Sequence, residues 1–357
     1  SGVTLNLNNV VGAVAVTNYP LIGNVSSTNG YTIGVQPSGV VASHLEVIGS
    51  TLYYVVDTLG DLWAGTAATN PTWWDIGTTT NWIGKAENNS PAYTYTDGDH
   101  VAFTDTAATG TVAIQAAVAP ASVTVDNSTL AYTINNTSGG IGGAATLTKR
   151  GTGNLTLAGA NTYTGTTIIQ GGQIIIAHSN ALGSASGNTT VATTGLNGTA
   201  RLSLSGDIDS PENVVITGLT EQTSGFRRAI DNSSGTNTLS GNVTLSSLTG
   251  GLRIGASSGQ LTFAGTITQT GSSTNLILNA QSNAVVVVNN AIANNGGELR
   301  VLGQSFTAAG TAGLVQLNAA SGSGIGETTV NQNGILKLGV ADALNTTANL
   351  TVGRTAS

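Results

Sequence analysis

Acidic residues form the closest grouping of side chains that could do chemistry in this sequence. Asp97, Asp99 and Asp105 lie together with His100, and a smaller acidic pair follows at 207–209. Carboxylate oxygens are ligands that Ca²⁺ prefers, and convergent carboxylates could cleave a polysaccharide by acid–base catalysis. The spacing matches no EF-hand loop, and Asp-Gly is an ordinary turn former. We expect a turn here, with Asp97, Asp99 and Asp105 as candidate calcium ligands and catalysis as the remaining alternative.

No other constellation in the sequence points to an enzyme. There is no nucleophile elbow, phosphate-binding loop, dinucleotide fingerprint or zinc-ligand pattern. Lys149 and Arg150 precede a Gly-rich corner, where they could meet a phosphate or sulfate, but two such cations before a turn usually face water. We therefore predict that the chain is not an enzyme, has no catalytic residues, and has no cofactor other than calcium.

All four tryptophans lie in one stretch, 58–103, at Trp63, Trp73, Trp74 and Trp82. Large amphipathic rings bury much area, so they can pin a long loop onto a larger body as a small core of their own. Two functional alternatives stay open. The rings could stack on sugar, or they could anchor a contact between subunits. The candidate interaction residues are Trp73, Trp74 and Trp82.

The secondary-structure elements that would position these side chains are clearest in residues 147–184. Three short runs there alternate apolar and small polar residues, at 154–158, 166–169 and 173–177, and glycine- or asparagine-rich corners separate them. Alternation with a period of two predicts half-buried strands, and glycine accepts the positive φ that tight corners need. Short strands joined by short corners are typical of a coil that winds around one core.

A second copy of part of this stretch follows downstream. The sequence at 328–339 matches the sequence at 166–177 without a gap, at a constant offset of 162 in residue number. Internal self-similarity of this kind indicates a repeat architecture. We expect Ile174–Ile176 and Ile335–Leu338 to occupy equivalent places in two rungs of the coil.

The same residues resemble a known family. The run GTGNLTLAGANTYTGTT, followed by GGQIIIAHSNALGS, is similar to the passenger-associated β-strand repeat of bacterial autotransporters, which also occurs in very long surface and secreted proteins of Gram-negative lineages. The similarity recurs, weakened, at 326–345, and 62–103 resembles the Trp-containing lead-in that often precedes this repeat. The resemblance implies a β-solenoid in the cell envelope or outside the cell, and it implies no catalytic residues.

Composition supports an ordered, thinly charged chain. Charged residues make up 8 % and hydrophobic residues 39 % of the 357 positions, and Cys and Met are absent. The formal charge of −7 and the pI near 4.7 argue against nucleic-acid binding. No apolar run is long enough for a membrane-spanning helix. No signal peptide is visible and the last residues form no capping element, so we expect a mature or trimmed piece of a longer polypeptide.

We predict an all-β fold, a parallel β-helix (β-solenoid) that is right-handed and three-sided, with the Trp-rich segment inserted or capping. Residues 1–57 are expected to be the β-rich end of a preceding solenoid unit or a small β-sandwich, and residues 58–103 a Trp-rich lead-in. Residues 104–357 are expected to form the solenoid, because strand centres recur at short and regular intervals.

The predicted function is structural. We expect a non-catalytic, extracellular or cell-surface segment of a long bacterial protein from a Gram-negative-type envelope, acting as a stalk, fibre or coat. Homo-oligomers or filaments would form through the solenoid ends or flanks. The alternative is an adhesin that binds cell-surface glycan or a neighbouring surface through the Trp-rich segment. A polysaccharide-active β-helix enzyme ranks last.

Overall fold

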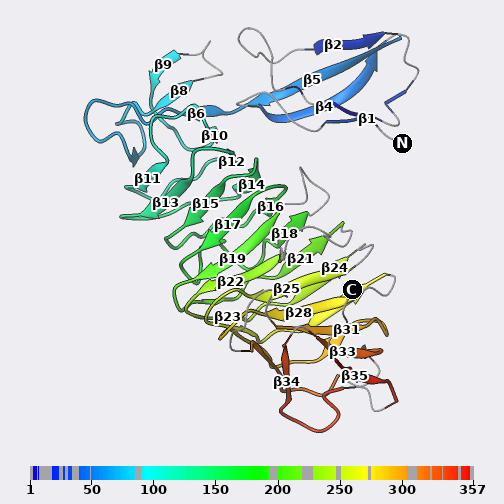
Figure 1. The fold of residues 1–357 in the computed structure, drawn as a ribbon. Helices are drawn as coiled ribbons and strands as arrows, with labels where there is room; N and C mark the ends of the chain where they lie inside the picture. The colour runs from blue at the N-terminus through cyan, green and yellow to red at the C-terminus, as the bar shows by residue number, and fades with distance from the viewer. Residues whose placement is uncertain are drawn as a thin grey trace.

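The fold consists of strands and corners. The computed structural model describes residues 3–5, 7, 18–23, 27–28, 31–33, 40–48, 50–84, 90–192, 200–218, 228–246, 251–271, 275–303, 312–321, 324–331, 333–344 and 347–353. Within these ranges the chain forms strands and no α-helix. Most of the strands belong to a solenoid that descends in chain order from β10 to β35 (Figure 1). The predicted all-β parallel solenoid is therefore confirmed.

The N-terminal strands lie outside the solenoid sheets. They form a three-stranded antiparallel sheet in the order β2-β5-β4 and a parallel pair, β1 with β3. Figure 1 shows this unit beside the upper end of the solenoid. Arg150 on the solenoid donates a hydrogen bond to the carbonyl of Val40 in this unit at 3.2 Å. The strands are β1 (Val3–Leu5), β2 (Asn18–Gly23), β3 (Tyr31–Ile33), β4 (Val40–Ile48) and β5 (Thr51–Leu59).

Two long sheets of twelve strands each form the solenoid walls. In spatial order the first long sheet holds β9 (Ser90–Tyr93), β8 (Trp82–Gly84), β6 (Asp61–Trp63), β10 (His100–Thr104), β12 (Ser122–Asp126), β14 (Thr146–Arg150), β16 (Thr167–Ile169), β18 (Thr189–Ala192), β21 (Val214–Thr217), β24 (Val243–Ser246), β27 (Ile267–Thr270) and β30 (Ile292–Ala293). The second long sheet holds β7 (Trp73–Trp74), β11 (Thr111–Ile114), β13 (Tyr132–Asn136), β15 (Asn154–Leu157), β17 (Gln173–Ile176), β19 (Arg201–Ser205), β22 (Ile230–Ser234), β25 (Leu252–Ala256), β28 (Leu276–Ala280), β31 (Leu299–Leu302), β33 (Thr328–Asn331) and β35 (Leu350–Val352).

A third wall is present only in the later coils of the described chain. This short sheet has six strands and begins at residue 209, so the earlier coils have two sheets and the later coils have three. In the second long sheet each coil contributes one strand, so the stack from β11 to β35 takes ten steps. At a strand spacing of roughly 4.8 Å, ten steps span about 48 Å. The short sheet holds β20 (Asp209–Ser210), β23 (Thr236–Leu239), β26 (Gln260–Phe263), β29 (Val285–Val288), β32 (Leu314–Leu317) and β34 (Ile335–Leu338).

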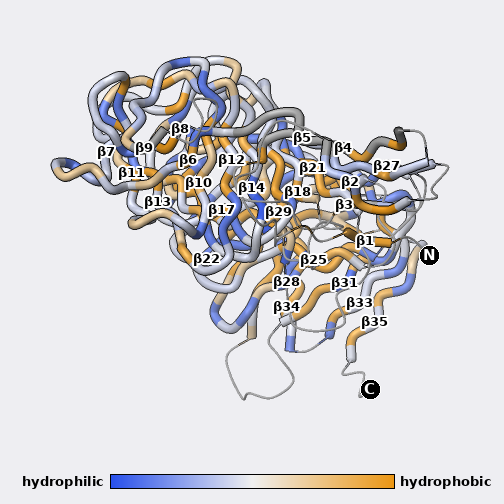
Figure 2. Tube along the Cα trace, turned by 90° about the horizontal axis from the view of Figure 1, so that it is seen from above, coloured by the Kyte–Doolittle hydropathy of each residue, from blue (hydrophilic) through white to orange (hydrophobic). Residues whose placement is uncertain are grey.

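The core is a set of columns in which each coil covers the next. Parallel register places inward side chains of successive coils directly over one another, and Figure 2 shows hydrophobic residues recurring along the stacked strands. Burying one such aliphatic side chain stabilises the fold by about 1.5–3 kcal/mol. The inward column of the second long sheet, 7 % exposed or less throughout, is Tyr132, Leu155, Ile174, Leu202, Ile230, Ile254, Leu278, Val301 and Val330.

The two sequence copies do not occupy equivalent places, so that expectation was wrong. The first copy forms β16 in the first long sheet and β17 in the second, whereas the second copy forms β33 in the second long sheet and β34 in the short one. The copies share a strand–corner–strand unit but lie one wall apart. Coil length explains the difference, because the step from Leu147 to its partner Thr167 is much shorter than the step from Val214 to Val243. The constant sequence offset therefore does not equal a whole number of turns.

Candidate functional site

An aromatic cluster closes the solenoid core where the chain enters it. Trp63, Trp74 and Trp82 are exposed by 1 % or less and come from three different strands, β6, β7 and β8. Trp82 meets Trp63 edge to face at a centroid distance of 5.2 Å and Trp74 at 5.4 Å, and Phe103 packs against all three. Edge-to-face pairs of this kind add stability beyond the area that they bury. Beside the cluster, the first long sheet ends in the antiparallel strands β6, β8 and β9.

This burial corrects the predicted interaction surface. Trp74 and Trp82 cannot stack on a ligand, because their rings lie inside the core. Neighbouring residues of a strand point to opposite faces, so Trp73 points outward where Trp74 points inward. Trp73 is 38 % exposed, and Ile76 nearby is 40 % exposed. Of the three residues proposed for contact, the structure presents Trp73 alone at the surface.

The three predicted calcium ligands have other partners. Asp97 accepts hydrogen bonds from the Tyr95 hydroxyl and the Ala119 amide, both at 2.8 Å, and Asp99 accepts one from the Thr96 amide at 2.8 Å. Across the described ranges, no group of three or more His, Cys, Asp or Glu side chains is arranged to hold a metal ion. The predicted calcium site is therefore not assembled in this structure, because these carboxylates accept hydrogen bonds from backbone amides and from the Tyr95 hydroxyl.

Asp105 supports the corner of the next coil. Its carboxylate accepts hydrogen bonds from the amides of Ser128, Thr129 and Leu130 at 2.9–3.0 Å. Burial opposes ionisation, but these backbone hydrogen bonds outweigh it and hold the pKa of Asp105 below its usual value. The side chain therefore acts as an ionised cap on the turn between β12 and β13.

Lys149 does not face water, contrary to expectation. Its side chain points into the core and is 0 % exposed, in the inward column between Val125 and Ile169. The ammonium group donates hydrogen bonds to the carbonyls of Arg150 and, at 3.4 Å, Gly151. Burial lowers the pKa of Lys149 to about 8, partly opposed by nearby carboxylates. Lys149 thus stabilises the glycine-rich corner by hydrogen bonds from inside the solenoid.

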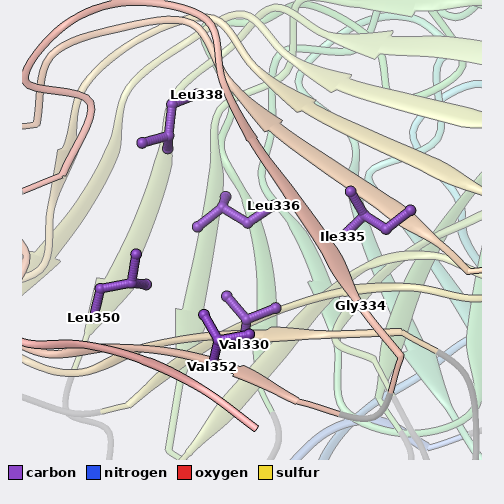
Figure 3. A pocket seen from close by; sticks show the side chains of 7 residues that line it. All are labelled: Val330, Gly334, Ile335, Leu336, Leu338, Leu350 and Val352. Carbon is purple, nitrogen blue, oxygen red and sulfur yellow. The ribbon is translucent and has the colours of Figure 1, made fainter.

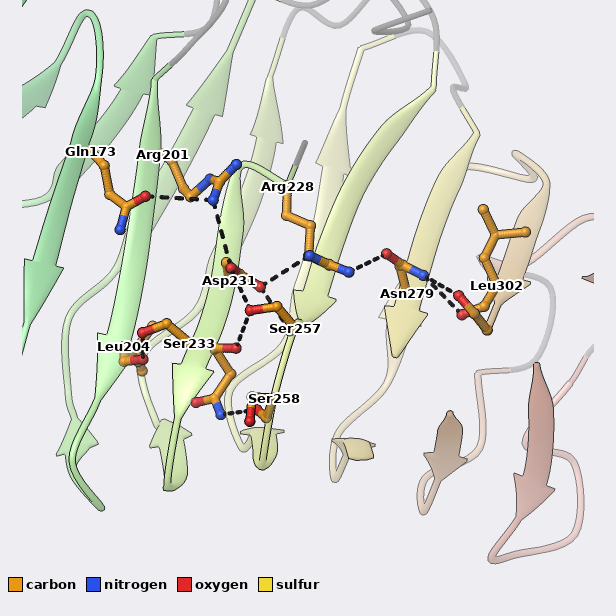
Figure 4. A network of polar contacts seen from close by, with 12 residues as sticks. Gln173, Arg201, Leu204, Arg228, Asp231, Ser233, Ser257, Ser258, Asn279 and Leu302 are labelled. Carbon is orange, nitrogen blue, oxygen red and sulfur yellow. Dashed lines mark hydrogen bonds and ion pairs between the residues drawn. The ribbon is translucent and has the colours of Figure 1, made fainter. Parts of the chain in front are cut away.

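The outward face of the second long sheet carries a polar network that the sequence did not reveal (Figure 4). Asp231 lies between Arg201, with an N–O distance of 3.7 Å, and Arg228 at 3.3 Å. It also accepts hydrogen bonds from the amide and hydroxyl of Ser257 at 3.0 and 2.9 Å. Arg228 reaches onward to the Asn279 amide oxygen at 2.5 Å. Residues from five strands or corners therefore meet on one face.

Glycine and register make this network possible. In the parallel ladder Gly255 pairs with Asp231 on one side and with Asn279 on the other. A Cβ at Gly255 would come within 2.0 Å of the Asn279 carbonyl oxygen, so glycine lets the two strands pair in this register and brings Asn279 into line with Asp231. The sequence signal was weak, since Arg201 and Arg228 lie on separate coils and are 27 residues apart in the sequence. To predict that these residues lie side by side, one would have to know the number of residues in each coil.

The last described coil exposes core positions. Leu350 is 53 % exposed, Val352 73 % and Leu338 47 %, although their partners in the preceding coil point inward. Together with Leu336 and the floor residue Val330, they line a depression of about 310 Å³ (Figure 3). The surface is a cross-section of the apolar core, and another β-coil would complement it by continuing the same columns.

Residues 147–176 match the family model of the passenger-associated transport repeat. The matched residues run from β14 to β17, so they form two adjacent coils and include the buried Lys149. The resemblance stated from the sequence is thereby confirmed for this segment. No curated protein and no solved structure matches the chain. No helix in the described ranges has the length and apolarity to span a membrane. The repeat and the solenoid fold suggest an autotransporter passenger-like protein, secreted or at the cell surface.

Proposed function

We propose, starting from the passenger-associated transport repeat at 147–176, that this chain is a non-catalytic structural segment of a bacterial surface or secreted protein. It acts as a stiff rod within a stalk, fibre or envelope coat. The observation that carries the proposal is the continuous parallel stack from β10 to β35, in which nearly every wall strand pairs with the strand before and after it. Such a stack gives length and stiffness with few long unpaired segments.

The described polar residues support a structural role. The acidic residues with the best spacing for chemistry, Asp97, Asp99 and Asp105, are hydrogen-bonded to turns of the solenoid. The buried Lys149 holds a corner. These side chains shape the coils, and each is directed to backbone groups of its own chain.

Self-association is the second part of the proposal. The aromatic cluster is buried at the N-terminal end of the solenoid, where the exposed large apolar side chains among the described residues are those of Trp73 and Ile76. The opposite end exposes Leu338, Leu350 and Val352 around Val330 (Figure 3). Exposed strand edges with apolar side chains favour pairing with another strand. We therefore propose that a second copy of the chain contacts the coil formed by β34 and β35.

Sedimentation velocity over a wide concentration range, with electron microscopy of the same samples, tests this contact. The wild type should form concentration-dependent oligomers, and the double variant Leu338→Lys/Val352→Lys should stay monomeric. Ile76→Lys is the matched control, because it adds a charge at an exposed apolar residue of the opposite end. Assembly that survives in the double variant, or a wild type that is monomeric at every concentration, would contradict the proposed contact.

A second candidate function, adhesion, is favoured by one observation: Trp73 is exposed while the other three tryptophans are buried. An exposed tryptophan can stack on a sugar ring or anchor a protein contact. A glycan array should then show binding that Trp73→Ala abolishes and Ile76→Ala keeps, with unchanged circular dichroism. Absence of binding by the wild type, or equal binding by Trp73→Ala, would reject this candidate.

A further inference from the structure

The corner between β33 and β34 contains an asparagine followed directly by a glycine, Asn333 and Gly334. It belongs to the last described coil, and Gly334 lines the depression of about 310 Å³ at that end (Figure 3). In an Asn-Gly pair the backbone nitrogen of the glycine can attack the side-chain amide carbon of the asparagine. Glycine has no Cβ to hinder this approach. The corner therefore holds both groups that a spontaneous deamidation needs.

The fold accounts for both residue types in this corner. A Cβ on Gly334 would lie 2.9 Å from the backbone nitrogen of Gly303 and 3.1 Å from the carbonyl oxygen of Asn331. The amide of Gly334 donates a hydrogen bond to that carbonyl at 3.0 Å and so closes a tight turn. Asn333 has a φ of 57°, a left-handed conformation that asparagine adopts more readily than most residues. The reactive pair is therefore a consequence of the turn.

The side chain of Asn333 is free to react. It is exposed, and within the described ranges it makes no hydrogen bond. The attack also requires the nitrogen of Gly334 to lose its proton, so the hydrogen bond that closes the turn has to open first. Such opening needs least free energy at the end of a stack. Among the described strands β34 is the outermost of the short sheet and pairs with β32 alone, so the turn ahead of it can open locally.

A second Asn-Gly pair in the described chain provides an internal comparison. Asn295 is also exposed and has a φ of 47°, and Gly296 follows it. Its side-chain amide, however, donates hydrogen bonds to the carbonyls of Gln269 and Gly271 in the preceding coil, at 3.1 and 3.0 Å. Both bonds must break before the amide carbon can turn toward the nitrogen of Gly296. The folded chain therefore restrains Asn295 and leaves Asn333 unrestrained.

We propose that Asn333 deamidates spontaneously, and that the product weakens the contact between copies at the last described coil. The nitrogen of Gly334 forms a bond to Cγ of Asn333, and the side-chain nitrogen leaves as ammonia with the proton of Gly334. Water then opens the resulting cyclic imide at either carbonyl. One product is aspartate, and the other is isoaspartate, in which the main chain runs through the side-chain carbon. Water is the only other reactant.

The effect on assembly rests on the self-association proposed above. A second copy seated on this coil would cover Leu338, Leu350 and Val352, and Gly334 lines the same depression. Either product places a carboxylate next to Gly334, and removing an unpaired charge from water is costly. Isoaspartate also lengthens the main chain in the turn ahead of β34. The contact would therefore weaken as the protein ages.

Peptide mapping by mass spectrometry, after incubation of the full chain at mildly alkaline pH, tests the chemical step. Asn333 should convert at least tenfold faster than Asn295 and give both aspartate and isoaspartate. In urea-unfolded chain the two rates should become similar, because the hydrogen bonds that restrain Asn295 are then lost. Absence of conversion at Asn333, or equal rates at the two residues in the folded chain, would overturn the proposal.

Sedimentation velocity of fresh and incubated samples tests the effect on assembly. Asn333→Asp should weaken self-association at least tenfold, and incubated wild type should shift toward it. Asn333→Gly accepts the positive φ without an amide to lose, so it should associate like fresh wild type at every age. Asn154→Asp adds the same charge at an exposed residue of β15, distant from this end, and should associate normally.

Equal association of Asn333→Asp and fresh wild type would overturn the effect on assembly, as would an equal loss in Asn154→Asp. Circular dichroism of each variant shows whether the fold is kept. A wild type that is monomeric at every concentration would overturn the proposed contact and this effect with it. The peptide map decides the chemical step separately, because deamidation of Asn333 does not require a second copy.

Discussion

Replacing Lys149 by methionine should change how the stability of the solenoid depends on pH. The ammonium group lies in an inward column at 0 % exposure and donates hydrogen bonds to the carbonyls of Arg150 and Gly151. Methionine fills a similar volume without charge, so it removes the cost of burying the ammonium. It also leaves those carbonyls without their lysine donor, at a cost of about 1–3 kcal/mol. At neutral pH the two effects oppose each other, and the pH dependence distinguishes them.

The size of the effect follows from the pKa of Lys149. Burial lowers it from 10.5 in the unfolded chain to about 8 in the folded chain. Between these values the unfolded chain binds more protons than the folded chain, so the free energy of unfolding rises with pH. The gap corresponds to about 3 kcal/mol. The wild type should therefore gain about 3 kcal/mol relative to Lys149→Met as the pH rises from about 8 to 10.5.

Urea unfolding followed by far-ultraviolet circular dichroism at several pH values from 7 to 10.5 measures this difference. Contributions of other titrating groups cancel, because the wild type and the variant differ only at residue 149. Lys337→Met, at an exposed position, should follow the wild type. If the difference between wild type and Lys149→Met stays constant over this range, the reasoning about the buried ammonium is refuted.

Three further perturbations have defined outcomes. Glu212 is 2 % exposed and accepts a hydrogen bond from Thr189, and burial raises its pKa from 4.5 to about 8. The folded chain then binds more protons than the unfolded chain between these values, so the free energy of unfolding should fall by up to about 5 kcal/mol as the pH rises from 4.5 to 8. Urea titrations of Glu212→Gln should lack this pH dependence. Trp82→Ala should cost about 3–5 kcal/mol, read from the thermal unfolding midpoint, because it leaves a cavity in the aromatic cluster; an unchanged midpoint would mean that the cluster does not stabilise the solenoid. Asp105→Ala should destabilise by about 1 kcal/mol at neutral pH, and the loss should vanish in acid where the carboxylate is protonated; a loss that persists there would rule out the ionised cap.

Most of the fold could be predicted from local sequence patterns. Alternation of apolar and polar residues at 154–157 and 173–176 identified strands that the structure contains as β15 and β17, because period-two alternation fits only an extended chain with one buried side. The glycine-rich corners that precede these two strands are also present, with positive φ at Gly151 and Gly172. The similarity of 166–177 to 328–339 correctly identified a repeated strand–corner–strand unit, but sequence offset alone could not assign the wall on which each copy lies.

The candidate site was much harder to predict. Spacing within a short stretch suggested Asp97, Asp99 and Asp105 as ligands. In the structure Asp99 accepts a hydrogen bond from an amide of its own turn, whereas Asp97 and Asp105 accept them from amides of the next coil. The polar network around Asp231 escaped notice because Arg201, Asp231 and Asn279 lie on different coils. The prediction for Lys149 was wrong for a related reason, because whether a strand residue faces the core depends on register. A lysine can occupy an inward position when the carbonyls of a corner accept hydrogen bonds from its ammonium group.

The sequence by itself determined that this chain forms short strands, turns at glycine-rich corners and winds as a parallel solenoid, because those features depend on residues close together in the chain. Only the tertiary structure decided which side chains share a column, which tryptophans are buried and where the arginines meet. Those outcomes depend on the length of each coil. The short coil from Leu147 to Thr167 and the longer one from Val214 to Val243 bring different partners together, even though their strands look alike.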